Sequence, residues 1–205
     1  MKKSFILIGF MLMASMANAQ DMANELVMKV IKQLNSHKNY EIAFEIQAGN
    51  TITTVGEKQS GKVSIQDKAY RLEMPDQEII SDGTTLWTYL IDDQEVMISD
   101  ASLESLLPPI KILTTYDKDY TMKYVKSDIA GKKQVEMTNP QGEFRRVILT
   151  IDEKKHEIEK AKIELEGGDE MVIDINSYAY DIALKDSFFT FDRKAHRNVD
   201  VIDMR

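Results

Sequence analysis

Residues 70–89 read YRLEMPDQEIISDGTTLWTY and contain three short strand-like runs, separated by Pro75-Asp76 and Asp82-Gly83. An Asp-Gly pair between apolar runs supplies the positive φ values that a tight hairpin turn requires. Pro75-Asp76 is also typical of a turn. Three strands within about twenty residues predict an antiparallel β-meander.

The chain on both sides of this meander continues the strand pattern. Before it, Tyr40–Ile46 alternates apolar with small or polar residues, and a short run follows at Lys62–Gln66. After it, the runs are separated by turn-forming residues such as Gly167-Gly168-Asp169, so consecutive hairpins are the simplest topology. We therefore expect about eleven strands, the later ones at residues 95–99, 121–126, 133–138, 144–152, 158–166 and 171–178.

Two segments break the strand pattern. Met22–Leu34 repeats its apolar residues at spacings of three and four, which predicts a helix. Ser102–Leu113 is a compact apolar insert with a short predicted helix that Pro108-Pro109 interrupts. Because strands such as Arg146–Ile151 alternate, one face of the sheet is solvated and the other needs a cover. The expected fold class is α+β, mainly β, with the helices on the apolar face.

The N-terminus has the features of an export signal. Lys2 and Lys3 precede an apolar run from Phe5 to Ala17, and Ala17-Asn18-Ala19 fits a signal-peptidase site. We expect residues 1–19 to be removed and residues 20–205 to form a single domain. The chain has no cysteine, so it carries no lipidated cysteine and no disulfide. The mature protein is expected to be soluble and exported, with stability supplied by its core.

The net charge limits the range of partners. The chain has 34 acidic and 26 basic residues, for a net charge of −8. Removal of Lys2 and Lys3 would make it more negative still. This balance disfavours nucleic acids and other phosphate-rich partners.

The sequence offers no catalytic constellation. His37, His156 and His196 lie in turn-like or terminal contexts without zinc-site spacing. Acidic pairs such as Asp92-Asp93 lie in predicted turns, and no regular calcium-loop spacing occurs. We expect no catalytic residues, no metal site and no cofactor, and we expect that the protein is not an enzyme.

The apolar residues leave two interpretations open. The insert at 102–113 is either ordinary core or a lid that lines a ligand site. Trp87 and Tyr89 lie two residues apart, so they share one face of their strand, where core packing is the default.

With these features in place, the chain resembles the LolA family of periplasmic outer-membrane lipoprotein carriers. The resemblance extends over nearly the whole mature chain, and Asp-Gly-x-x-Leu-Trp after an Arg-containing strand is its more specific part. The residues that carry it are Tyr70–Glu73, Gln77–Gly83, Leu86–Tyr89, Phe189–Asp192 and Val199–Asp203.

The resemblance implies a fold and a site. The fold is an incomplete, unclosed antiparallel β-barrel whose hollow is covered by helices and receives the acyl chains of a lipoprotein. By position, the concave wall would include Phe44, Ile46, Leu72, Trp87 and Tyr89. The lid would include Leu106, Leu107, Ile110 and Leu113.

The resemblance also implies a latch: in the best-known members of the family, a basic residue in the strand before the Trp motif holds the cavity closed. Here the nearest positions are Gln66 and Asp67, so the latch is unmatched. Lys68 or Arg71 would replace it if its side chain pointed inward.

The implied partners are acylated lipoproteins as cargo, an inner-membrane lipoprotein-releasing transporter and an outer-membrane acceptor. The resemblance also implies transient proximity to membranes, and we expect a monomer. The alternative is a lipid- or lipoprotein-sensing regulatory domain of the same fold, as in RseB-like proteins. Those proteins append a second domain, and the end of this chain soon after Val201-Ile202-Asp203 favours the carrier.

Overall fold

The structure, a computed structural model, describes residues 21–50, 54–101, 120–185 and 187–205. Its described part contains one helix, residues 21–35, and thirteen strands. The strands are β1 (Tyr40–Asn50), β2 (Thr54–Val55), β3 (Gln59–Gln66), β4 (Ala69–Glu73), β5 (Gln77–Ser81), β6 (Thr85–Leu90), β7 (Glu95–Asp100), β8 (Thr121–Val125), β9 (Lys132–Thr138), β10 (Phe144–Asp152), β11 (Glu157–Leu165), β12 (Asp169–Tyr180) and β13 (Asp200–Asp203).

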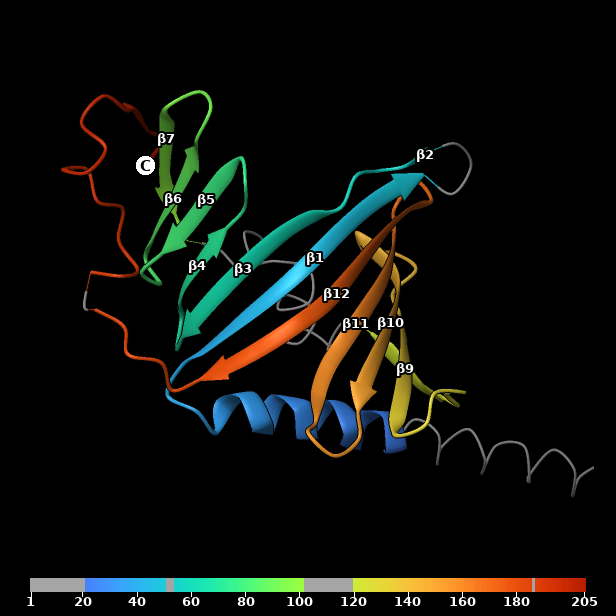
Figure 1. Cartoon of the computed structure of the whole chain (residues 1–205). Helices are drawn as coiled ribbons and strands as arrows, with labels where there is room; N and C mark the ends of the chain where they lie inside the picture. Colours follow the sequence, from blue (N-terminus) through green and yellow to red (C-terminus); the bar gives the residue numbers. More distant parts are fainter. Residues whose placement is uncertain (1–20, 51–53, 102–119, 186) are drawn as a thin grey trace, which may run out of the picture.

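The strands form a single open sheet that curves strongly (Figure 1). Its order is β13-β7-β6-β5-β4-β3-β1-β12-β11-β10-β9-β8, and the short β2 pairs with β1. The expected incomplete β-barrel is confirmed. The sequence predicted every long strand, but it did not predict β2 or β13. The edge strand β13 pairs with β7 in parallel, whereas β7 pairs with β6 in antiparallel orientation.

Strand register defines two faces of the sheet. Opposite partners in neighbouring strands share a face, so Ile42, Val63 and Leu72 lie side by side on one of them. This face carries the main hydrophobic cluster, which joins strands from β6 to β8 in the sheet order across the interior of the curve. We call it the concave face, and the opposite one the convex face.

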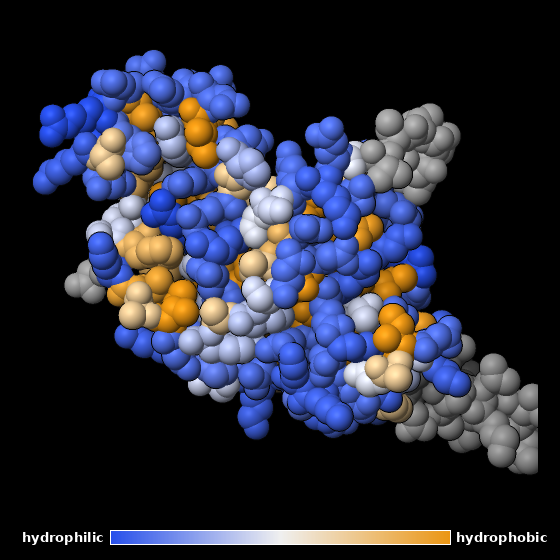
Figure 2. Space-filling model, viewed as in Figure 1, coloured by the Kyte–Doolittle hydropathy of each residue, from blue (hydrophilic) through white to orange (hydrophobic). Residues whose placement is uncertain are grey.

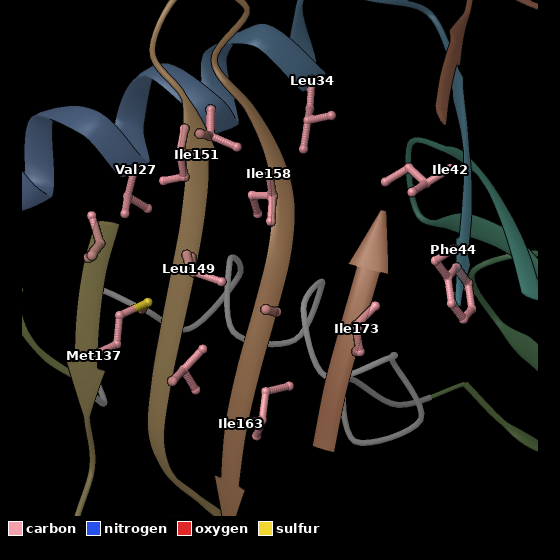
Figure 3. Packing of buried hydrophobic residues seen from close by; sticks show 14 of the residues in the cluster. Val27, Leu34, Ile42, Phe44, Met137, Leu149, Ile151, Ile158, Ile163 and Ile173 are labelled. Atoms are coloured by element: carbon pink, nitrogen blue, oxygen red, sulfur yellow. The ribbon is translucent and has the colours of Figure 1, made fainter. Parts of the chain in front are cut away.

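The helix packs on the concave face near the β10–β11 turn, at the end of β10 and the start of β11 (Figure 3). Leu26, Val27, Val30 and Leu34 are buried on one side of the helix, as the period of three and four predicts. In Figure 3, Val27 and Leu34 point toward the space that Ile151 and Ile158 also enter. The same period also predicts Met22 on this buried side, but Met22 is exposed.

The convex face is largely hydrophilic over β1, β3, β11 and β12 (Figure 2). Ion pairs link its neighbouring strands. Lys62 Nζ lies 3.4 Å from Glu41 Oε2 and 3.1 Å from Glu73 Oε2. Lys160 Nζ lies 2.8 Å from Asp174 Oδ1. This is the solvated face that the alternating strands predicted.

The C-terminal segment, residues 182–185 and 187–199, runs beside β4–β7 before the chain enters β13 (Figure 1). The Tyr89 ring contacts Phe191 and His196 of this segment at centroid distances of 5.5 and 4.9 Å. Ile80 and Val96 lie on the same convex face and are also buried. The sheet therefore has a second, smaller core on its convex face at β4–β7.

Candidate functional site

The concave face is nearly free of charge. Alternation along the antiparallel strands β1 and β3–β12 assigns only Glu95, Lys133 and Asp169 to it among charged residues, and all three lie at or next to the start of a strand. Its tyrosines add no charge at neutral pH, because burial raises the pKa of Tyr40 and of Tyr70 to about 12. Among the described strands, the middle of this face offers a charged ligand group no partner of opposite charge.

The concave face divides into two halves. Near the helix, side chains such as Leu149, Ile151 and Ile158 are buried. Elsewhere on this face, mainly toward the end of β1 and the start of β12, some apolar side chains are only partly buried and pack against the main cluster. They lie beside buried neighbours such as Phe144, Ile163 and Ile173. The partly buried side chains are Ile46, Met74, Ile79, Leu165, Met171 and Ile175. We call these six residues the open half; they form the candidate ligand-binding surface.

A glycine shapes the floor of the open half. Gly61 is the register partner of Phe44, and a Cβ at this position would lie 2.5 Å from Phe44 Cζ and closer still to the Met74 sulfur. The absence of a side chain thus lets the Phe44 ring and Met74 extend over β3. Methionine is flexible and polarizable, so Met74 and Met171 give the surface the ability to adapt to different apolar ligands.

The predicted wall residues lie on two faces. Phe44, Ile46 and Leu72 lie on the concave face. Trp87 pairs with Ile80, and Tyr89 pairs with Val96, on the convex face. The expectation that all five residues line one wall is therefore wrong, because Trp87 and Tyr89 lie on the opposite face. Tyr89 packs under the C-terminal segment, because β4–β7 bury apolar side chains on both faces.

The two predicted latch residues do not point into the hollow. Arg71 lies on the convex face, where its guanidinium bonds Glu78 Oε2 at 2.7 Å and the Phe188 carbonyl oxygen at 3.3 Å. Lys68 is exposed in the β3–β4 turn. Neither Arg71 nor Lys68 therefore forms the inward-pointing latch that the resemblance implies. Arg71 instead anchors the C-terminal segment.

The predicted lid lies outside the described residues. Leu106, Leu107, Ile110 and Leu113 all fall within 102–119. Their role as a lid stays a prediction.

The described histidines serve structural contacts. His37 Nδ1 lies 2.7 Å from Asp181 Oδ2, and its ring stacks on Tyr180 at 4.1 Å. His196 packs against Tyr89 and Phe191. His156 adopts a φ of 55° in the β10–β11 turn. Across the described ranges, no three His, Asp or Glu side chains are grouped in a way that could hold a metal ion.

A polar joint holds the helix exit against the end of β12. The buried Asn39 donates from Nδ2 to the Ile182 carbonyl oxygen at 3.1 Å and accepts the Ile182 N–H at 2.8 Å. Asp181 accepts the Lys38 N–H at 2.8 Å. The His37 imidazole is the main cause that lowers the pKa of Asp181, and this N–H adds to the effect. Sequence reasoning missed this joint, because it unites polar residues more than 140 positions apart.

In the parts of the chain that the structure describes, no helix is both long and apolar enough for a membrane crossing. The geometry is that of a binding protein: a curved open sheet with an apolar, nearly uncharged and partly exposed concave face.

Comparison with known proteins identifies the family. The family model for LolA, described as outer membrane lipoprotein carrier protein, matches residues 35–192. The chain therefore belongs to the LolA family. A comparison with curated protein sequences gives no significant match.

Solved structures share the fold at low sequence identity. An uncharacterized conserved protein from Thermus thermophilus superposes with a TM-score of 0.60 at 13% identity, over 89% of this chain and 99% of that one. A DUF1329 family protein from Desulfovibrio piger gives 0.51 at 14% identity, over 86% and 98%. These similarities extend the fold assignment over most of the chain.

Proposed function

We propose that the protein is a soluble periplasmic carrier that shields the acyl chains of lipoproteins and moves them from the inner to the outer membrane. The observation that carries the proposal is the open half of the concave face, which is apolar, uncharged and partly exposed. Membership of the LolA family supports the same interpretation.

The energetics favour such a site. Burial of each methylene contributes roughly 0.8 kcal/mol, so one long acyl chain represents on the order of ten kcal/mol. An uncharged surface accepts the hydrocarbon while the polypeptide stays in solvent. The partly exposed position of Ile46 and Met171 leaves the ligand a way to exchange.

The direct test is to purify the protein from the periplasm and identify bound material by mass spectrometry. We expect acylated polypeptides, in larger amounts when a lipoprotein is overproduced. Recovery of the protein without acylated polypeptide or lipid under those conditions would contradict the proposal.

A matched pair of variants tests the face itself. Met171 lies in the open half, while its neighbour Val172 is a partly buried residue on the convex face. Met171→Asp places a charge on the binding surface, so we expect it to reduce recovery of acylated material at least about tenfold, given the cost of desolvating a carboxylate. Val172→Asp should retain it. Thermal unfolding of both variants shows that each is folded, and equal retention by both would exclude the concave face.

A carrier must also release its cargo. We expect a palmitoylated peptide that is bound to the protein to transfer to acceptor vesicles quickly. Without the protein, the same peptide should transfer more slowly from its own aggregates in detergent-free buffer. A protein that retains the peptide in the presence of excess acceptor would instead act as a lipid or lipoprotein sensor, the alternative for this fold.

A further inference from the structure

Two turns and the start of the helix meet at one end of the sheet. The β8–β9 turn (126–131) and the β10–β11 turn (153–156) are joined by the Glu153 N–H, which donates to the Gly131 carbonyl oxygen at 3.1 Å. Met22 and Glu25 of the helix share a pocket with Glu153 and His156. We call residues 126–131, 153–156 and Met22 the turn end.

The turn end exposes large apolar side chains. Ile129, at the tip of the β8–β9 turn, is 59% exposed, and Met22 is 51% exposed. Among the described residues, only three others of this kind are exposed: Met28, Ile202 and Met204. Figure 2 shows apolar surface surrounded by hydrophilic side chains at this end, at the lower right. An isoleucine at the tip of an exposed turn has no evident role in the core.

Free positive charge surrounds this apolar tip. Lys126, Lys154 and Lys155 are exposed and form no ion pair within the described ranges. Most acids nearby are already paired: Asp152 and Glu159 share Lys132, Glu153 lies 3.6 Å from Lys133, and Glu25 lies 2.6 Å from Lys29. Within the described ranges, the exposed Asp128 and Asp21 and the half-buried Glu157 are nearby acids without an ion pair. Among its own residues, the turn end carries three lysines against Asp128 and Glu153, in a chain of net charge −8.

Both turns are held in place by side-chain hydrogen bonds. Asp152 Oδ1 accepts the N–H groups of Lys154 and Lys155, each at 2.9 Å. The Ser127 hydroxyl oxygen accepts the Ile129 N–H at 3.1 Å. The lysines and the isoleucine therefore sit on ordered backbone, which lowers the entropy lost when they bind a surface.

We propose that the turn end docks on an anionic lipid membrane. Ile129 enters the headgroup region, and Lys126, Lys154 and Lys155 face the lipid phosphates, since an apolar tip within a cationic rim matches such a surface. The open half lies at the opposite ends of the strands, near Ile46 and Met171, so docking leaves it accessible. This inference goes beyond the acyl-chain site and needs no bound cargo.

The test is sedimentation of the protein, purified as the cell produces it, with two kinds of vesicles. One kind contains phosphatidylglycerol in phosphatidylcholine, and the other contains phosphatidylcholine alone. We expect binding to the anionic vesicles only, and we expect added salt to weaken it because screening shortens the range of the attraction.

Variants at the turn end should remove this binding. Ile129→Asp should lower the partition coefficient at least about tenfold, because the inserted apolar surface is lost. Lys154→Glu/Lys155→Glu should lower it about 25-fold or more, since each lysine near an anionic surface contributes about fivefold. Both changes are on the exposed surface, so thermal unfolding should show little change.

Matched controls lie at the other side of the molecule. Ile202→Asp changes an apolar side chain that is 43% exposed in β13, and Arg193→Glu/Lys194→Glu reverses two exposed charges in the C-terminal segment. Both controls should bind anionic vesicles as the unmodified protein does. Loss of binding in the controls but not in the turn-end variants, equal binding to neutral vesicles, or no vesicle binding would each overturn the proposal. Copurification of acylated material, measured without vesicles, separates this outcome from failure of the carrier function.

Discussion

At the scale of single residues, Gly61 acts by leaving space. Its position opposite Phe44 on the concave face has room only for a hydrogen atom, because the Phe44 ring and the Met74 sulfur occupy the place of a Cβ. Met74 is a flexible side chain that can move, whereas the aromatic ring of the buried Phe44 has less freedom.

Gly61→Ala should therefore destabilise the fold by about 1–3 kcal/mol, the usual cost of overpacking. Urea unfolding measures this. In the double variant Gly61→Ala/Phe44→Leu the smaller side chain should relieve part of the overlap, so the two changes should not be additive. An unfolding free energy for Gly61→Ala within about 0.5 kcal/mol of the unmodified chain would show that the ring moves freely.

Asp152 is a second residue with a specific role, because its contacts set the pH dependence of the unfolding free energy. The Lys132 ammonium is the main cause that holds the pKa of this carboxyl well below its usual range, and the N–H groups of Lys155 and Lys154 add to the effect. A carboxylate with a depressed pKa in the folded state stabilises the fold above its unfolded pKa of about 3.9 and loses that contribution as the pH falls below it.

Asp152→Asn should thus lower the unfolding free energy at neutral pH. The difference in unfolding free energy between the variant and the unmodified chain should shrink as the pH falls below about 4. Urea unfolding at neutral and acid pH measures both points. Asp128→Asn is the control, because Asp128 is exposed and forms no ion pair in the described ranges. A difference in unfolding free energy that stays constant across the acid range would contradict the stabilising role of the Asp152 carboxylate.

At the scale of elements, the sequence predicted the strands well because each has its own alternation and its own turn residues. The Asp82-Gly83 turn is an example: Gly83 has a φ of 92°, and Asp82 accepts the N–H groups of Thr84 and Thr85. The strand β13 was missed, because four residues without clear alternation become a strand only through their parallel pairing with β7.

The main error was to predict Trp87 and Tyr89 of the meander on the concave face, and its cause is physical. Leu86 and Tyr89 are both buried, although they point to opposite faces of β6. Where both faces of a strand are covered, alternation alone does not say which face is concave. One signal was present: the register set by the turns places Arg71 and Glu78 on the same face as Trp87 and Tyr89, and charges are unexpected in an acyl-chain cavity.

The C-terminal segment and β6 should stabilise each other through their aromatic contacts. Tyr89→Ala should cost about 3 kcal/mol as a large-to-small change at a buried site. A double-mutant cycle with Phe191→Ala should give a coupling of about 0.5–1.5 kcal/mol, as expected for an aromatic pair. Unfolding free energies that are simply additive would show that the segment does not depend on this contact.

At the scale of the whole molecule, one sheet separates two tasks. The main cluster on the concave face near the helix and the smaller convex core at β4–β7 hold the fold together, while the open half of the concave face remains partly exposed. The separation follows from strand pleating, which sends adjacent residues such as Met171 and Val172 to opposite faces. Alternation along the strands indicated an apolar face, but only the register showed which residues share it.

This separation predicts how ligand affects stability. A ligand that binds only the folded chain stabilises it by mass action, by about 2.7 kcal/mol at a hundred times its Kd. Added palmitoylated peptide should therefore raise the Tm of the unmodified chain and of Val172→Asp, but not that of Met171→Asp. Tyr89→Ala should start from a lower Tm and still show the full increase, because its contacts lie on the convex face. If Tyr89→Ala lost the increase while remaining folded, the convex face would take part in binding, and the division between the faces would be wrong.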